Sequence, residues 1–81
     1  MAVRVLLFAS IADAAGTRQL EVAYRPGDTV ASLCERLTSA RPELCRFLPT
    51  LLFALDEDYV KPSAPVPDGA TLALIPPVSG G

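Results

Sequence analysis

Histidine and tryptophan are absent from this 81-residue sequence, and only two cysteines, Cys34 and Cys45, are present. Histidine is the commonest general base and the commonest metal ligand in proteins, so its absence removes the usual catalytic sets. Two thiols without histidine do not complete a four-ligand zinc site. We therefore expect no metal, no stably bound cofactor and no catalysis by the chain alone, with both thiols reduced.

Basic residues are few and dispersed: seven Lys plus Arg stand against nine Asp plus Glu, a formal net charge of −2. Nucleic-acid-binding proteins carry a basic patch or stripe, so we expect no nucleic-acid partner. The apolar run at residues 5–9 is far too short to span a membrane, and the N-terminus lacks the pattern of a signal peptide. These features predict a cytoplasmic protein without a membrane partner.

Apolar residues, by contrast, make up 51% of the sequence. A chain of this length forms one small domain, which buries about 60–65% of the surface that its unfolded form exposes. Some of the apolar surface is therefore expected to stay exposed. On a small domain, a large exposed apolar patch usually marks a partner site.

Alternating or β-branched apolar residues predict several strands. The predicted strands are residues 3–9, 18–24, 51–55 and 71–75, with a short edge strand at 59–60. The residues between the first two strands, 10–17, are expected to form a connection that closes on Gly16. Residues 61–69 contain three prolines and end in Asp68-Gly69, which indicates a loop.

The clearest single element is an amphipathic helix after the second strand. Asp28 or Thr29 offers a side-chain oxygen to cap its first turn. Pro42 stops it, because the residue before a proline avoids the α region. A short further turn is expected at residues 43–48. Apolar residues at helical spacing form one stripe: Val30, Leu33, Cys34 and Leu37.

This order of elements, with strands leading and trailing around one helix, predicts an α+β roll. If the first and last strands pair in parallel at the centre of a mixed sheet, the helix lies on the crossover side. That arrangement is the β-grasp, or ubiquitin-like, fold. Periodicity alone leaves it as one of several plausible topologies.

An acidic run and Cys45 are the remaining candidates for chemistry within the domain. The run at residues 56–58 lacks the glycine and the distal glutamate of a calcium loop, so a solvated turn is favoured over an ion site. Cys34 lies on the apolar stripe and is expected in the core. Cys45 has Arg41 and Arg46 nearby, and a reactive thiol is the less favoured alternative there.

The C-terminal segment reads Ile75-Pro76-Pro77-Val78-Ser79-Gly80-Gly81. Two prolines favour a stiff, extended exit, and two glycines pass through a channel in which a β-carbon would clash. Six residues from Pro76 reach about 20 Å at full extension. We expect a β-grasp domain over residues 1–75 and a flexible tail over 76–81. For the glycine pair alone, a frayed terminus is an equally good explanation.

These segments together resemble the small subunit of molybdopterin synthase, the MoaD family. The resemblance rests on residues 3–9 followed by Gly16, on the Asp68-Gly69 turn and on the ending at residues 76–81. It covers the whole chain. A terminal Gly-Gly is shared with ubiquitin and with the thiamin sulfur carrier ThiS, whereas Pro-Pro-Val-Ser-Gly-Gly is more specific to the molybdopterin branch.

The resemblance implies a β-grasp sulfur carrier of molybdenum cofactor biosynthesis. An E1-like enzyme of the MoeB type would use ATP to adenylate Gly81, and a sulfur donor would convert the adenylate to a thiocarboxylate. The tail would then insert into a MoaE-type large subunit, within a heterotetramer, and give its sulfur to cyclic pyranopterin monophosphate. Gly80 would provide clearance in the channel. Catalytic residues for the pterin chemistry would belong to the partner.

Partner contacts are expected around the base of the tail. Period-two geometry places Leu6 and Phe8 on the face of the first strand opposite to Val3, Val5 and Leu7. If the first and last strands are neighbours, Phe8 and Ile75 lie together. The residues predicted to contact partners are Phe8, Tyr59, Ile75, Pro76, Pro77, Val78 and Ser79.

Three alternatives stay open. A related carrier for thiamin or tRNA thiolation shares the chemistry but has a different sulfur acceptor. A ubiquitin-like modifier would instead be conjugated to lysines through Gly81. A non-catalytic interaction domain would use neither Gly80 nor Gly81.

Overall fold

The fold is built from a short series of strands and helices within residues 2–77, the part of the chain that the computed structural model describes. In chain order they are β1 (Ala2–Leu7), α1 (Ala9–Ala15), β2 (Gln19–Ala23), α2 (Val30–Ala40), the 3-10 helix η1 (Pro42–Thr50), β3 (Leu52–Leu55), β4 (Asp58–Val60) and β5 (Thr71–Ile75). Each predicted strand is present, with ends that shift by no more than a few residues.

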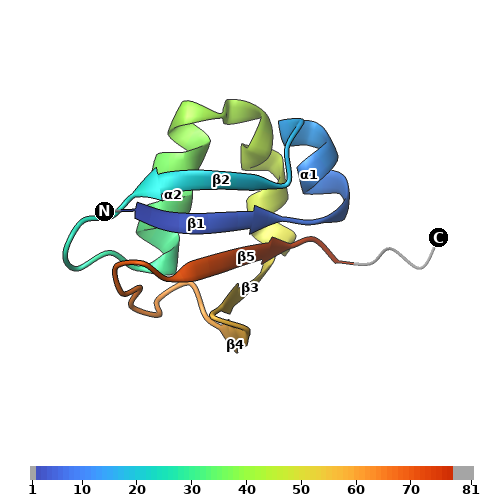
Figure 1. Ribbon diagram of the computed structural model, residues 1–81. Coiled ribbons are helices and arrows are strands. Elements are labelled where there is room, and N and C mark those ends of the chain that lie inside the picture. The colour runs from blue at the N-terminus through green and yellow to red at the C-terminus, as the bar shows by residue number, and fades with distance from the viewer. Residues whose placement is uncertain (1, 78–81) are drawn as a thin grey trace.

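The strands form one mixed sheet in the order β2-β1-β5-β3-β4 (Figure 1). The first and last strands, β1 and β5, lie parallel at its centre, with Leu7 opposite Leu74. The other pairs, β1–β2, β3–β4 and β3–β5, are antiparallel. The predicted central parallel pair is confirmed, and with α2 packed on the sheet this is the β-grasp arrangement.

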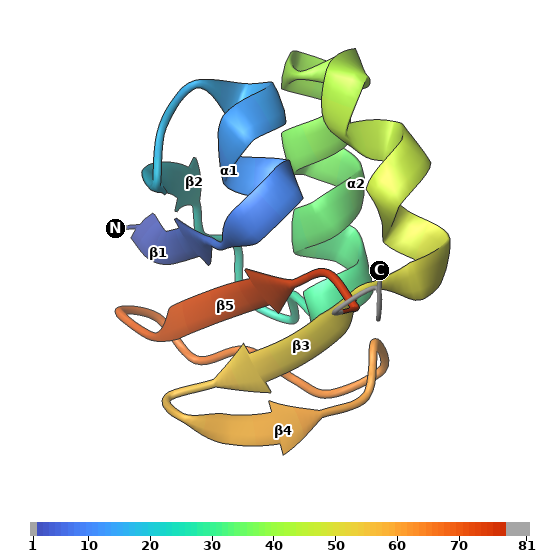
Figure 2. The same ribbon diagram turned by 90° about the vertical axis from the view of Figure 1, so that its right-hand side faces the viewer.

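All three helical segments cover the same face of the sheet (Figure 2). The core lies between these layers, where Val3, Val5 and Leu7 of β1 meet Leu33 and other apolar residues of α2. Each of these four side chains is at most 2% exposed. Full burial of such a side chain stabilises the fold by about 1.5–3 kcal/mol. Within residues 2–77, no helix covers the opposite face, here called the outer face.

Helix α2 follows the predicted pattern closely. Thr29 is its N-cap, and its Oγ1 accepts a hydrogen bond from the Ser32 backbone N–H while Ser32 Oγ accepts one from the Thr29 N–H. The helix ends at Ala40, two residues before Pro42. Cys34 is buried on the apolar stripe, and burial raises the pKa of its thiol to about 11. This thiol is therefore a core side chain.

The turn from β2 into α2 is tied together by Asp28, the one charged side chain that is buried among the described residues. Its carboxylate accepts hydrogen bonds from the Arg25 backbone N–H at 2.8 Å and from Ser32 Oγ at 2.8 Å. Arg36 donates to both carboxylate oxygens, at 3.1 and 2.8 Å. These hydrogen bonds, those from Arg36 foremost, hold the pKa of the Asp28 carboxyl well below its usual range.

Helix α1 corrects the expectation that residues 10–17 form a simple connection. The segment is alanine-rich, which favours a helix, and Ile11 anchors it in the core with 0% exposure. Gly16 ends the helix at a φ of 73°, and its N–H donates to the Ala12 carbonyl. The single large apolar side chain gave too little periodicity to predict the helix.

Two further turns depart from or refine the predictions. The short turn expected at residues 43–48 is a longer 3-10 helix that continues through Pro49 to Thr50. The acidic turn between β3 and β4 places Asp56 at a φ of 48° and Glu57 at a φ of 75°. Two consecutive positive φ angles in a two-residue loop are typical of a type I′ hairpin, which favours glycine at its second position.

Candidate functional site

The base of the tail lies where the two central strands end. Leu7 of β1 is opposite Leu74 of β5, so Phe8 and Ile75 are the next residues on neighbouring strands. This register supports the prediction that the two lie together. The next residue, Pro76, starts the tail, and Val78, Ser79, Gly80 and Gly81 lie outside the described residues.

The two prolines at the base of the tail differ in exposure. Pro77 is exposed, and its contact with a partner stays a prediction. Pro76 is buried within the chain itself, which differs from the prediction that it offers a contact surface. Its ring fixes φ near −65°, so a buried Pro76 sets the point and the direction from which the tail leaves the sheet.

The outer face carries an apolar patch near the base of the tail. Among residues 2–77, the exposed large apolar side chains are Phe8 at 45%, Leu52 at 51% and Tyr59 at 72%. Leu52 is opposite Ile75, and Tyr59 is level with Ala54 and Ala73 along the sheet. We call this patch the apolar face and define it as Leu6, Phe8, Leu52, Tyr59, Ala73 and Ile75.

Leu52 was not predicted as part of this patch. The run Leu51 to Leu55 is apolar at each position, so the sequence pattern did not show which side chains face outward. Register resolves this: Leu55 faces the core opposite the buried Leu72, and Leu52 therefore has the parity of the outer face. The sequence did carry one signal. A strand that is apolar on both faces needs a covering layer on each, and the helices of this chain cover only one face.

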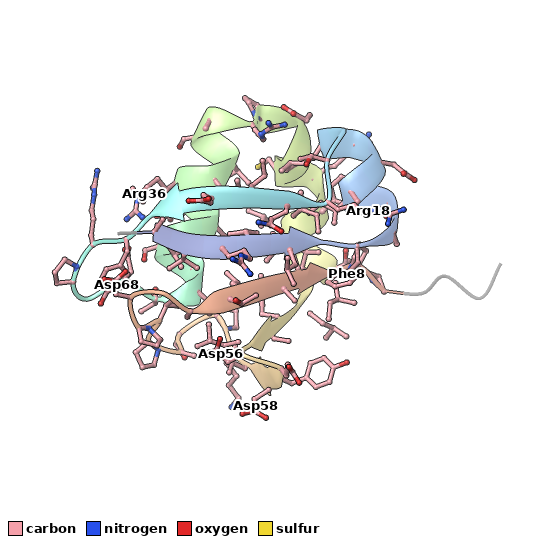
Figure 3. All side chains as sticks on the ribbon, in the orientation of Figure 1. Phe8, Arg18, Arg36, Asp56, Asp58 and Asp68 are labelled. Carbon is pink, nitrogen blue, oxygen red and sulfur yellow. The ribbon has the colours of Figure 1, made fainter. Side chains whose placement is uncertain are left out.

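The outer face changes character away from the tail. Arg4 of β1 lies between Glu21 of β2 and Thr71 of β5, which gives this end a polar, charged surface. Asp56 lies at the same end, because its N–H donates to the Thr71 carbonyl at 2.8 Å. Figure 3 shows Phe8 at the opposite end of the sheet from Asp68 and Arg36. The face is thus apolar beside the tail, and the acidic turn borders it, because Asp56 and Glu57 line a hollow together with Leu6 and Phe8.

In residues 2–77, no three acidic, cysteine or histidine side chains lie close enough to hold a metal ion. Cys45 is exposed, and no side chain among residues 2–77 donates a hydrogen bond to it or accepts one from it. Every helix within residues 2–77 is too short or too polar to cross a membrane. Within residues 2–77, the feature available for contact with another protein is the apolar face.

A mixed sheet with its first and last strands parallel at the centre and its helices on one face places the protein in the class of ubiquitin-like folds. Within this class, the chain belongs to the ThiS family, which matches it over residues 5–81. It is 34% identical to the molybdopterin synthase sulfur carrier subunit of Chlamydomonas reinhardtii, with 100% of both chains covered. The resemblance to the molybdopterin synthase small subunit that the sequence predicted is confirmed.

Solved structures support the same fold. SAMP1 from Haloferax volcanii superposes with a TM-score of 0.89 at 28% identity, covering 100% of both chains. A chain from the complex of subunits 1 and 2 of the molybdopterin-converting factor of Helicobacter pylori superposes with a TM-score of 0.70 at 22% identity, again over 100% of both chains. The β-grasp prediction is thereby confirmed by structures as well as by the sheet topology.

Proposed function

We propose that this protein is the sulfur carrier subunit of a molybdopterin synthase and that it works in the cytoplasm. The observation that carries the proposal is the full-length identity of 34% to a protein named for this role. The geometry supports it, because the tail leaves the sheet beside an exposed apolar face. A carrier needs such a face to dock its tail reproducibly into another protein.

In the proposed cycle, Gly81 is the residue that reacts. An E1-like enzyme of the MoeB type joins the Gly81 carboxylate to the AMP of ATP and releases pyrophosphate. A sulfur donor then displaces AMP from the acyl-adenylate and leaves a thiocarboxylate on Gly81. ATP is thus consumed by the partner, and this chain supplies the acyl group and holds no cofactor of its own.

The larger subunit of the synthase is the proposed receiver of the charged tail. The Helicobacter pylori complex contains two subunits of a molybdopterin-converting factor, which supports a partner of this kind. Phe8, Tyr59 and Ile75 would dock on the surface of that subunit. Residues 77–79 would contact the walls of the subunit's channel, and Gly80 would pass through the narrowest part of that channel. We expect a heterotetramer in which two carriers give sulfur to cyclic pyranopterin monophosphate.

The test is the intact mass of the protein isolated from its own host. We expect a species in which one oxygen is replaced by sulfur, located at Gly81 by fragmentation. A Gly81→Val variant should keep the fold but fail to accept AMP or to enter the channel, because a β-branched side chain does not fit where glycine passes. A host in which deletion of residues 80–81 leaves molybdopterin synthesis intact would refute the proposal.

A ubiquitin-like protein modifier is the second candidate. It is favoured by the similarity to SAMP1, because a solved structure of the Haloferax volcanii protein is named small archaeal modifier protein 1. A modifier would leave its C-terminal residues joined to lysines of other proteins. Proteomics of the host distinguishes the two, since a carrier alone gives a thiocarboxylate without such lysine adducts.

A further inference from the structure

Two cations flank the base of the tail, one beyond each edge of the sheet. Arg18 directly precedes β2, and its carbonyl accepts a hydrogen bond from the Leu7 N–H at 2.8 Å. Lys61 directly follows β4; Val60 is opposite Phe53, so Lys61 is level with Leu52 and hence with Ile75. Register therefore places both cations at the level where the tail leaves, one beyond each edge of the sheet.

Both cations are exposed and have no ion-pair partner among residues 2–77. The arginines near the helices, by contrast, each lie against a partner side chain of the same domain. Arg36 binds Asp28, Arg41 lies 3.8 Å from Glu43, and Arg46 stacks 5.0 Å from the centre of the Phe47 ring.

Each cation lies beside apolar surface. Arg18 lines a hollow with Leu6 and Phe8, and Lys61 lines another with Leu52 and Tyr59. Figure 3 shows Arg18 and Phe8 at the same end of the sheet. Asp13 also lines the first hollow, but its carboxylate is not within ion-pair distance of Arg18. An arginine next to an aromatic side chain is a composition typical of protein interfaces.

The acidic side chains of the sheet lie between the two cations or at the end away from the tail, and Asp56 and Glu57 border the apolar face in a hollow lined by Leu6 and Phe8. Asp56 and Thr71 are bonded to each other, and Asp68 lies at the end away from the tail (Figure 3). The protein has a net charge of −2. Near the tail, Arg18 and Lys61 lie beyond the two edges of the sheet, Asp13 lines the Arg18 hollow, and Asp56 and Glu57 line that separate hollow with Leu6 and Phe8. Charge arranged in this way orients a molecule during encounter and raises the association rate with a surface of opposite sign.

We propose that Arg18 and Lys61 pair with carboxylates on either side of the channel entrance of the larger subunit. The partner surface is thereby identified by its chemistry: an apolar seat for Phe8 and Leu52, with an acidic group beyond each side. The two pairs fix the rotation of the carrier about its tail, which the apolar face alone does not define. This inference rests on the proposed function, because it specifies how the same docking occurs.

Calorimetric titration of the folded protein with the larger synthase subunit from the same genome tests the inference. The variants are Arg18→Glu, Lys61→Glu and the double variant. The matched control is Arg25→Glu, because Arg25 is also exposed but lies in the turn at the opposite end of β2. We expect each reversal beside the tail to weaken binding about fivefold at low salt, and the double variant about 20-fold or more. The effect should shrink as salt is raised, and the control should match the unaltered protein.

A compensating change separates this assignment from general damage. Replacing the acidic residues at the channel entrance with lysine should restore binding of the double variant and weaken binding of the unaltered protein. Equal affinities for all variants would overturn the inference while leaving the carrier role in place. The inference would also be overturned if the variants bound the larger subunit normally and bound only the adenylating enzyme more weakly, because the acidic surface would then belong to the adenylating enzyme. If the unaltered protein does not bind the larger subunit, the proposed function itself fails.

Discussion

Phe8→Ala is the substitution that most directly tests the apolar face as a docking surface. The Phe8 side chain is 45% exposed beside the tail. A phenylalanine presents about 200 Å² of apolar surface, so about 90 Å² is available to a partner. At about 25 cal/mol per Å², burying this area contributes about 2 kcal/mol, which is a change of about 30-fold in Kd. We expect the variant to bind the larger subunit more weakly by this factor.

The assay is a titration of each variant against the larger subunit, with thermal unfolding measured in parallel. Parallel unfolding matters because the buried part of Phe8 also contributes to the fold. Tyr24→Ala is the matched control, since Tyr24 is a partly buried aromatic residue that follows β2 at the end away from the tail. It should lose some stability and keep its affinity. A folded Phe8→Ala protein that binds within about threefold of the unaltered protein would refute the reasoning.

Three further predictions concern the turns that shape the domain. The free energy of unfolding should decrease as the pH is lowered below about 4, because protons bind Asp28 in the unfolded chain more readily than in the native one. Chemical denaturation over a series of pH values checks this, and Asp28→Asn should flatten the acidic part of the series. Glu57→Gly should raise stability by about 1 kcal/mol in denaturant titrations, because glycine adopts the positive φ of this position without strain; an unchanged midpoint would contradict this account of the turn. Thr29→Ala should lower stability by about 1 kcal/mol through loss of the α2 cap, whereas Thr50→Ala, at an exposed site, serves as the control.

Sequence patterns predicted the parts of the fold in which side-chain periodicity and burial coincide. The stripe of α2, from Val30 to Leu37, and the alternation in β1 both match the buried sets. Helix α1 escaped prediction because alanines carry little hydrophobic signal, and the helix depends on Ile11 and on packing against η1. Local propensity and tertiary contacts together stabilise such a segment, and only the first is visible in the sequence.

The candidate site was predictable in part for a similar reason. Phe8 was recognised because its strand alternates, whereas Leu52 lies in a run that is apolar throughout. The burial of Pro76 depends on how the neighbouring elements close around the end of β5, which no local pattern encodes. The flanking cations Arg18 and Lys61 are 43 positions apart by their numbers and meet the same end of the sheet only through strand register.

The central place of β5 has a consequence for how the protein is made. Of the strands in residues 2–77, β5 is synthesised last, yet it joins β1 to β3 and so links two hairpins that do not otherwise touch within the sheet. An isolated hairpin is at best marginally stable in water. We expect nascent chains cut before residue 71 to stay unfolded by circular dichroism and to be degraded. Folding therefore waits for the synthesis of β5. A chain acquires its docking surface only once the segment that bears its tail has been synthesised.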